Sequence, residues 1–276
     1  LQAPASSSDA ALAAHPLHAP LHRLGAREAL AAGSLLEAEL RARAAVRLQP
    51  GSADGWLLLA ATAGARHDAA VERNAIREAL ARLHQPASPQ LVAHLVARFP
   101  APAELAALAP TEAAPWEHLV TGLLAHAPAH ADAVANARAY RDPDDPRPLR
   151  HRFEASLALG SPALALHHAR LWRGLAPRDP HAHLAVARAL QAHAPPRTDA
   201  LREALEGALA VVEPDDAALR GMVEEQLLRA LLRPEAPVAR TRLVELASAL
   251  RTRPTDDATR RRRLALVEPI LAELAP

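Results

Sequence analysis

Apolar residues recur along this chain at the spacing of an α-helix rather than that of a β-strand. In the C-terminal third they fall at i, i+3 or i+4, and i+7, which places each set on one helical face. Three amphipathic helices are therefore predicted there. Their apolar stripes are Leu201, Leu205, Ala208 and Leu209; Leu243, Leu246 and Leu250; and Leu264, Val267 and Leu271.

The last of these helices also has a predicted start and a predicted irregularity. Thr255, followed by Asp256 and Asp257, is a suitable capped beginning, because a hydroxyl and acidic groups satisfy the free N–H groups of a first turn. Pro269 is expected to interrupt or kink the helix, since proline has no N–H to donate.

Helix-breaking residues divide the rest of the chain into short segments. The sequence has 25 Pro and 10 Gly, and most of them cluster between apolar stretches one helix or one helix pair long. Breakers at such regular intervals indicate an internal repeat. The principal clusters are 50–51, 86–89, 100–102, 110–115, 142–148, 177–180, 195–196, 214, 234–237 and 254.

Superimposing the segments gives repeats that start at residues 19, 53, 113, 146 and 180. The first two starts differ by 34 residues (53 − 19 = 34). Small residues at fixed places let paired helices approach closely, while glycine and proline end them where the chain reverses. The matching residues are Gly33, Ala38, Ala45 and Pro50; Trp56, Leu59, Ala60, Ile76 and Ala79; Trp116, Leu119 and Ala139; Gly160, Ala165 and Pro177; and Ala187 and Leu190.

Over residues 19–190 this pattern resembles the tetratricopeptide repeat, in a degenerate form. Some residues depart from it: His67 and Glu72 stand where glycine and alanine are expected, and Arg152, Phe153 and Trp172 also differ. The resemblance implies an all-α, right-handed solenoid of antiparallel helix pairs.

The expected organisation has three parts. Residues 1–18 form a disordered or irregular leader, and residues 19–194 form the tetratricopeptide-like array, with a shortened pair at 86–112. Residues 195–276 continue as degenerate helix pairs that end in a capping helix.

Composition supports this fold and removes several kinds of function. Half of the residues are hydrophobic but only 2% are aromatic, so Leu, Ala and Val must fill the core. The absence of Cys excludes disulfides and thiolate sites, and the absence of Lys excludes Schiff-base chemistry. A net charge of +1 argues against a dedicated nucleic-acid binder. No apolar run approaches the ~18 residues of a membrane span.

The opening segment bears on the compartment. Residues 1–8 read Leu-Gln-Ala-Pro-Ala-Ser-Ser-Ser and are typical of the stretch that follows a cleaved signal or anchor. This favours a periplasmic or secreted location over a cytoplasmic one.

No motif of a known catalytic site occurs. The serine-hydrolase elbow, the zincin helix, the P-loop and the dinucleotide fingerprint are all missing from the sequence. Adjacent carboxylates such as Glu224 and Glu225 diverge by about 100° on a helix. The sequence therefore predicts a protein that is not an enzyme and that has no cofactor and no metal site.

The 15 histidines require separate consideration. His15, His18 and His22 have the spacing of metal ligands on one helical face, but the intervening Pro16 and Pro20 favour a polar N-terminus without a continuous helix. Pro128 separates another pair in the same way. Structural hydrogen bonds or solvent exposure are expected for the pairs His126 and His130, His167 and His168, and His181 and His183.

Two charged clusters are interpreted as structural. Asp142, Asp144 and Asp145 resemble half of a calcium loop, but the loop lacks the glycine and glutamate of that site and is expected to be a linker. The run from Arg260 to Arg263 suits a polar capping helix, with contact to an acidic partner as the alternative.

The tetratricopeptide resemblance also implies where a partner binds. In that family the first helix of each pair lines the concave face and touches extended peptides. The positions carried over from the matching repeats are Arg23, Arg27, Arg147, Arg150, Glu154, His181, Arg188 and Gln191. These residues imply a groove of basic character, suited to an acidic protein segment.

Three functions remain open at this stage. The first is a non-catalytic interaction scaffold or adaptor that holds a partner segment on its concave face. The second is the recruiting or regulatory region of a larger enzyme, such as a glycosyltransferase or sulfotransferase. The third, an RNA-binding helical repeat, is disfavoured by the net charge and the scarcity of aromatic residues.

Overall fold

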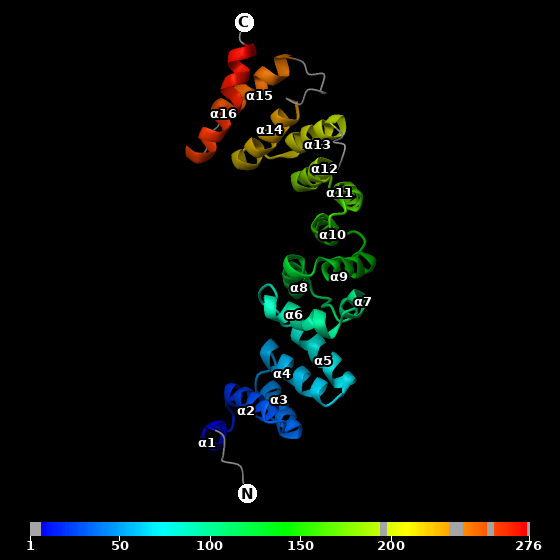
Figure 1. Ribbon diagram of the computed structural model, residues 1–276, viewed down its shortest axis with the longest axis vertical. Helices are drawn as coiled ribbons and strands as arrows, with labels where there is room; N and C mark the ends of the chain where they lie inside the picture. The colour runs from blue at the N-terminus through cyan, green and yellow to red at the C-terminus, as the bar shows by residue number, and fades with distance from the viewer. Residues whose placement is uncertain (1–6, 194–197, 232–239, 253–256, 275–276) are drawn as a thin grey trace. The chain divides into compact units, whose positions relative to one another are not determined.

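The protein is helical throughout the part that the structure describes. This computed structural model describes residues 7–193, 198–231, 240–252 and 257–274, and within these ranges it contains sixteen helices and no strand (Figure 1). The predicted all-α class is confirmed. The chain divides into two compact units, residues 1–138 and 139–276, and each unit is described by itself.

Unit 1 begins with paired helices, and two short helices, α6 and α7, precede its last two. Neighbours in sequence pack on each other, α2 on α3, α3 on α4 and α4 on α5. The shortened pair expected over residues 86–112 is present as α6 and α7. The helices are α1 (Ser7–Ala14), α2 (Ala19–Ala31), α3 (Leu35–Leu48), α4 (Ala53–Ala65), α5 (Ala69–Leu80), α6 (Pro89–Arg98), α7 (Pro102–Ala106), α8 (Ala113–His126) and α9 (Pro128–Arg141), which ends in unit 2.

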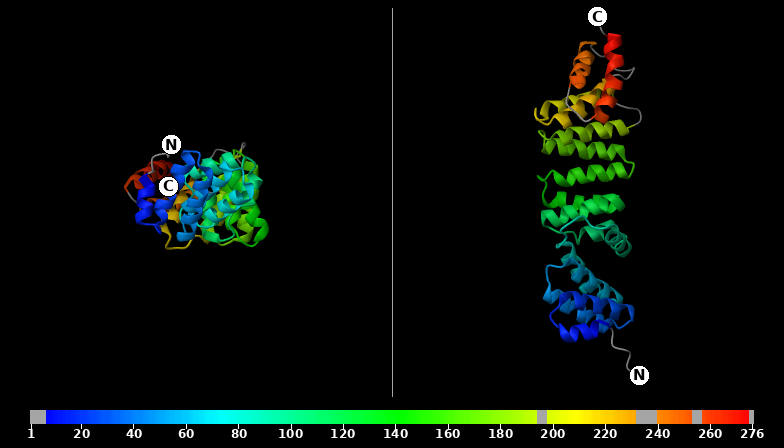
Figure 2. Two further views of the ribbon diagram at one scale, coloured as in Figure 1. Left: turned by 90° about the horizontal axis from the view of Figure 1, so that it is seen from below. Right: turned by 90° about the vertical axis from the view of Figure 1, so that its left-hand side faces the viewer.

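Unit 2 is a consecutive stack in which each helix from α10 to α16 packs on the next (Figure 2). Pro269 lies inside the last helix, which continues through it, while Thr255 and Asp256 of its expected cap lie outside the described residues. The helices are α10 (Arg147–Ala158), α11 (Pro162–Leu175), α12 (Pro180–Ala192), α13 (Thr198–Val211), α14 (Ala217–Leu231), α15 (Arg240–Thr252) and α16 (Asp257–Leu274).

The prediction of an irregular leader is wrong for residues 7–14, which form α1. Their alanine-rich composition favours a helix, and a tertiary contact anchors it. The buried hydroxyl of Ser8 donates to Glu28 Oε2 at 2.5 Å and accepts from Arg41 Nη1 at 3.2 Å. The helix stops before Pro16, as expected, and residues 1–6 lie outside the described part.

Three helix pairs turn in the same way. Gly33, His67 and Gly160 occupy the same repeat position and have positive φ values of 76°, 62° and 68°. After each, an N–H closes the preceding helix onto a carbonyl five residues back, at 2.8 to 2.9 Å, from Ser34 to Ala29, from Asp68 to Ala63 and from Ser161 to Ser156. The turn predicted from Gly33 and Gly160 is thus also made by histidine.

A second shared turn precedes the first helix of four repeats. In each of them, the residue before the loop proline accepts a hydrogen bond from the N–H of the residue three positions on, at 3.0 to 3.3 Å. The four donor–acceptor pairs are His18 to His15, Ser52 to Gln49, Asp145 to Asp142, and Asp179 to Ala176.

Each unit has its own apolar core, built largely of Ala, Leu and Val as predicted. The largest fully buried side chains of unit 1 include Trp116, Ile76 and Leu95, and those of unit 2 include Phe153 and Leu205. In the described part of the chain, no helix has the length and apolarity needed to cross a lipid bilayer.

Glutamate replaces a small packing residue in the second repeat. Glu72, on α5, stands opposite Gly64 on α4, whose missing Cβ would lie 2.9 Å from Glu72 Oε1. The buried carboxylate accepts two hydrogen bonds from Arg98, both at 2.5 Å, and this pairing raises the pKa of Arg98 above its ordinary value. Because Gly64 has no side chain, it leaves room for the glutamate that stands in place of the expected alanine.

Candidate functional site

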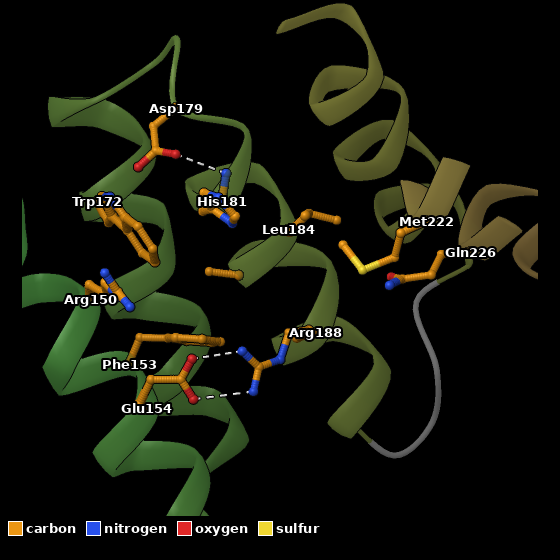
Figure 3. Close-up of a pocket in the computed structure, with 11 residues that line it drawn as sticks. Arg150, Phe153, Glu154, Trp172, Asp179, His181, Leu184, Arg188, Met222 and Gln226 are labelled. Atoms are coloured by element: carbon orange, nitrogen blue, oxygen red, sulfur yellow. Dashed lines mark hydrogen bonds and ion pairs between the residues drawn. The ribbon is translucent and has the colours of Figure 1, made fainter. Parts of the chain in front are cut away.

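A pocket of about 410 Å³ opens on unit 2 between helices α10, α11, α12 and α14. Figure 3 shows side chains from all four helices pointing toward its centre. Arg150 and Trp172 lie on one side, and Met222 and Gln226 lie on the opposite side. Its volume falls within the ~300–1,000 Å³ range that is common for ligand pockets.

The floor of the pocket is aromatic and aliphatic. Phe153, from α10, and Trp172, from α11, have ring centroids 6.5 Å apart at a tilt of 51°. Leu184 on α12 is buried beside them, whereas Met222 on α14 is 40% exposed. An apolar side chain entering the pocket therefore finds rings on one side and a flexible thioether on the other.

An ion pair between two repeats bounds the floor. The Arg188 guanidinium donates to both Glu154 carboxylate oxygens, at 2.7 and 3.2 Å, across 34 residues of sequence. Its Cζ atom also lies 5.2 Å from the centroid of the Phe153 ring, within range for a cation–π contact. Arg188 is consequently held in place by groups of the pocket itself.

Two polar groups of the pocket have unused bonding capacity. Arg150 is exposed, and its guanidinium makes no ion pair with any residue in the described ranges. The Oε1 atom of Gln226 is buried and accepts no hydrogen bond from the described residues. A cation and an orphaned amide oxygen thus face the same space, one suited to a carboxylate or carbonyl and the other to an N–H donor.

Asp179 and His181 complete the lining. One oxygen of Asp179 caps α12 by accepting the backbone N–H of His181 at 2.9 Å (Figure 3). This cap fixes the start of the helix that carries Leu184 and Arg188 into the pocket.

The pocket brings together four of the eight predicted groove residues, namely Arg150, Glu154, His181 and Arg188. The other four are not among its lining residues. Arg23, on α2 of unit 1, donates to Gln49 Oε1 at 2.7 Å, and Arg27 is exposed on the same helix. Gln191 is exposed near the end of α12, and Arg147 is engaged elsewhere.

Ion pairs within unit 2 reduce the free positive charge of the predicted groove residues. Arg147 donates from Nε and Nη2 to the two carboxylate oxygens of Asp145, both at 2.8 Å, and Arg188 is paired with Glu154. Among the described groove residues of unit 2, Arg150 is therefore the arginine that remains for an external anion. Arginine positions alone overestimated the free positive charge because the sequence does not reveal tertiary ion pairs.

The apolar floor was missed by the sequence analysis. Phe153 and Trp172 differ from the repeat pattern, and the residues at the same positions of the second repeat are Ala60 and Ala79. A large ring at the position of a small residue needs more room between the neighbouring helices, because protein interiors are closely packed. That substitution was the available signal. Nothing in the sequence pointed to Met222 or Gln226.

Some histidines make structural hydrogen bonds, and others, such as His126, His167 and His181, are exposed. His130 Nε2 is 3.0 Å from the carbonyl oxygen of Phe99, and His168 Nδ1 is 3.1 Å from Ser156 Oγ. Pro128 separates α8 from α9, as the sequence indicated. In the described part of the chain, no group of three or more His, Asp or Glu residues is placed to hold a metal ion.

The two charged clusters lie in a connecting loop and on the last helix. Asp142 and Asp145 belong to the loop before α10, where Asp145 is buried and paired with Arg147, so the loop acts as a connector. The arginine run lies on α16, with Arg261 and Arg262 exposed, and nothing is described for the side chains of Arg260 and Arg263.

Comparisons with known proteins give little beyond the fold. No protein-family model matches the chain, and no curated protein sequence matches it at a significant level. Solved structures do match, and one is the crystal structure of the APC/C hetero-tetramer Cut9-Hcn1, with 12% sequence identity and a TM-score of 0.37. The match covers 98% of this chain but 45% of that one, so the chain spans less than half of that neighbour's length. The all-helical, paired architecture of the chain itself fits a tetratricopeptide-like fold.

Proposed function

We propose that the chain is a non-catalytic interaction scaffold and that the unit 2 pocket binds a short segment of a partner protein. The observation that carries this proposal is the pairing of an apolar floor with unused polar groups in one open depression. An apolar anchor with a few convergent polar groups is the usual composition of a recognition site.

The chemistry of the lining favours a polypeptide with one apolar side chain next to a carboxylate or carbonyl. The apolar group packs against Trp172, Leu184 and the exposed Met222, above the buried Phe153 ring, while Arg150 takes the oxygen. A backbone N–H of the segment satisfies Gln226 Oε1.

Charge balance favours protein over nucleic acid as the partner. Arg150 and Arg188 line the pocket together with Glu154 and Asp179, so the positive and negative side chains are equal in number apart from His181. Nucleic-acid sites depend on an excess of cations against phosphates, which this lining does not provide.

The test begins by identifying the bound segment at the pocket itself. A photo-crosslinking amino acid is placed at exposed His181, and a control is placed at exposed Arg73 on α5 of unit 1. Crosslinked peptides from the native cell extract are sequenced, and the segment enriched from His181 is synthesised.

Affinity of that peptide is then measured by titration calorimetry. We expect Arg150→Glu to weaken binding at least about tenfold, since a charge-assisted bond is worth roughly 1.5–3 kcal/mol. Arg73→Glu, the matched charge reversal, should leave the affinity unchanged. Equal crosslinking from both positions, or equal affinity for Arg150→Glu and the parent protein, would contradict the proposal.

A further inference from the structure

In three repeats, a ring near the start of the first helix donates an N–H to the loop that precedes that helix. Six residues after the proline of each loop, the side chain reaches back to the proline carbonyl. The distances are 2.8 Å from His22 Nε2 to Pro16, 2.9 Å from Trp56 Nε1 to Pro50, and 3.0 Å from His183 Nε2 to Pro177. A carbonyl only accepts, so the ring nitrogen is the donor in each case.

The fourth loop with this turn lacks the ring. Its proline is Pro143, and the residue six positions later is Leu149. The backbone turn is the same, with Asp145 N 3.3 Å from the Asp142 carbonyl oxygen. Leucine has no N–H and less volume than an indole, so neither the bond nor the packing of the other repeats is made here.

A second pocket, of about 370 Å³, lies at this position in unit 2. Pro143 and Leu149 line it, together with the outer face of α11, where Leu171 and Leu175 are 45% and 43% exposed. Gly174 adds further room, since no atom lies within 4 Å of where its Cβ would be. The cavity is therefore open and largely apolar, with the Arg147-paired carboxylate of Asp145 also in its lining.

In unit 1, arginine side chains cover the faces of two tryptophan rings. The Arg82 guanidinium carbon lies 5.1 Å from the Trp56 ring centroid, and that of Arg138 lies 5.1 Å from Trp116. The second pocket also has a cation in its lining, Arg170, at a different repeat position from Arg82. Arg170 is exposed and forms no ion pair or side-chain hydrogen bond within the described residues. A ring in this pocket has a guanidinium available to cover its face.

We propose that the second pocket is a docking site for a tryptophan side chain of a partner protein. The indole N–H donates to the Pro143 carbonyl, the ring packs on Leu149, Leu171 and Leu175, and Arg170 covers it. The chain has three tryptophans, and Trp56, Trp116 and Trp172 are all placed elsewhere, so the ring comes from outside this sequence. This site is separate from the pocket proposed above, because no residue lines both.

The test uses N-acetyl-L-tryptophanamide as the probe and ¹⁵N-labelled protein in an NMR titration. Amide shifts are expected at Leu149, Leu171 and Leu175, with a dissociation constant on the order of 0.1–1 mM. N-acetyl-L-leucinamide, which lacks a ring and an N–H donor on its side chain, should bind at least about fivefold more weakly. A capped pentapeptide with central tryptophan should bind at least as well as the capped residue.

Two variants fill the pocket from within the chain. Leu149→Trp restores the residue found at Trp56, and Gly174→Leu projects a side chain into the open space. Each should abolish the shifts while the far-ultraviolet circular dichroism stays unchanged, and Gly174→Leu alone decides if Leu149→Trp misfolds. Arg170→Gln should weaken binding about two- to fivefold through loss of the cation–π contact.

Several results would overturn the inference. Shifts confined to Leu184 and Arg188 would place the probe in the first pocket, which would leave the proposed function intact. Equal binding of the leucine probe would remove the requirement for a ring, and binding of free tryptophan without the capped forms would rule out a polypeptide source. Binding of the probe that survives both pocket-filling variants would also overturn the proposal.

Discussion

Replacing His67 by glycine should stabilise unit 1. His67 has a φ of 62° at the position that Gly33 and Gly160 occupy in the equivalent turns. A side chain in this left-handed conformation costs roughly 1–2 kcal/mol. Glycine removes that cost but adds about 0.5–1 kcal/mol of unfolded-chain entropy. His67 is exposed, so little packing is lost, and the net gain in the free energy of unfolding is about 0.5–1 kcal/mol.

Urea unfolding measured by tryptophan fluorescence reports this change. The chain has three tryptophans, of which Trp56 and Trp116 lie in unit 1 and Trp172 in unit 2. A Trp172→Phe background therefore restricts the signal to unit 1. The midpoint should rise for His67→Gly at an unchanged slope.

Two controls separate strain from the general effect of glycine. His67→Ala retains a Cβ and should change the stability by no more than a few tenths of a kcal/mol. Ala65→Gly, at the exposed last residue of α4, should cost up to about 1 kcal/mol. A midpoint for His67→Gly that falls as far as that of Ala65→Gly would refute the reasoning that the histidine backbone is strained.

Two further substitutions test close helix approach. Gly64→Ala should cost about 1 kcal/mol because its Cβ lies 2.9 Å from Glu72 Oε1, yet should stabilise by about 1 kcal/mol in a Glu72→Ala background, as measured by a double-mutant cycle. An equal stability change for Gly64→Ala in both backgrounds would show that its cost does not come from the contact with Glu72. Gly122→Ala should cost about 3 kcal/mol because its Cβ meets the Ala87 carbonyl oxygen at 2.4 Å, whereas Gly174→Ala meets no atom within 4 Å and should stabilise slightly in thermal unfolding. Equal melting temperatures for these two variants would disprove the packing argument.

The parts of the fold predicted from sequence are those set by local chemistry. Gly33 and Gly160 mark turns that need a positive φ, and Pro128 marks a boundary between helices because it lacks an N–H. Such effects operate within a few residues and can be read along the chain. The helix α1 was missed because its stability includes the distant contacts of Ser8 with Glu28 and Arg41.

The candidate site was predictable only in part for the same reason. Repeat register placed Arg150, Glu154, His181 and Arg188 on the first helices of their pairs, and these four side chains do line one pocket. Register carries no information on which arginine is neutralised by a carboxylate on another helix. Met222 comes from α14, outside the matched repeats, and its contribution depends on how that helix packs in unit 2.

The alanine-rich cores have a consequence for how this protein tolerates change. Alanine has no side-chain rotamers to lose on folding, so the interior is ordered at little entropic cost. Each buried alanine also removes little surface from water, and cohesion is spread over many weak contacts instead of a few large anchors. Added methyl groups have nowhere to go at fully buried positions such as Ala42, Ala135 and Ala187, where both helices must shift. Sequence drift should therefore concentrate on the outward faces, while the interior changes only by matched replacements across a helix pair.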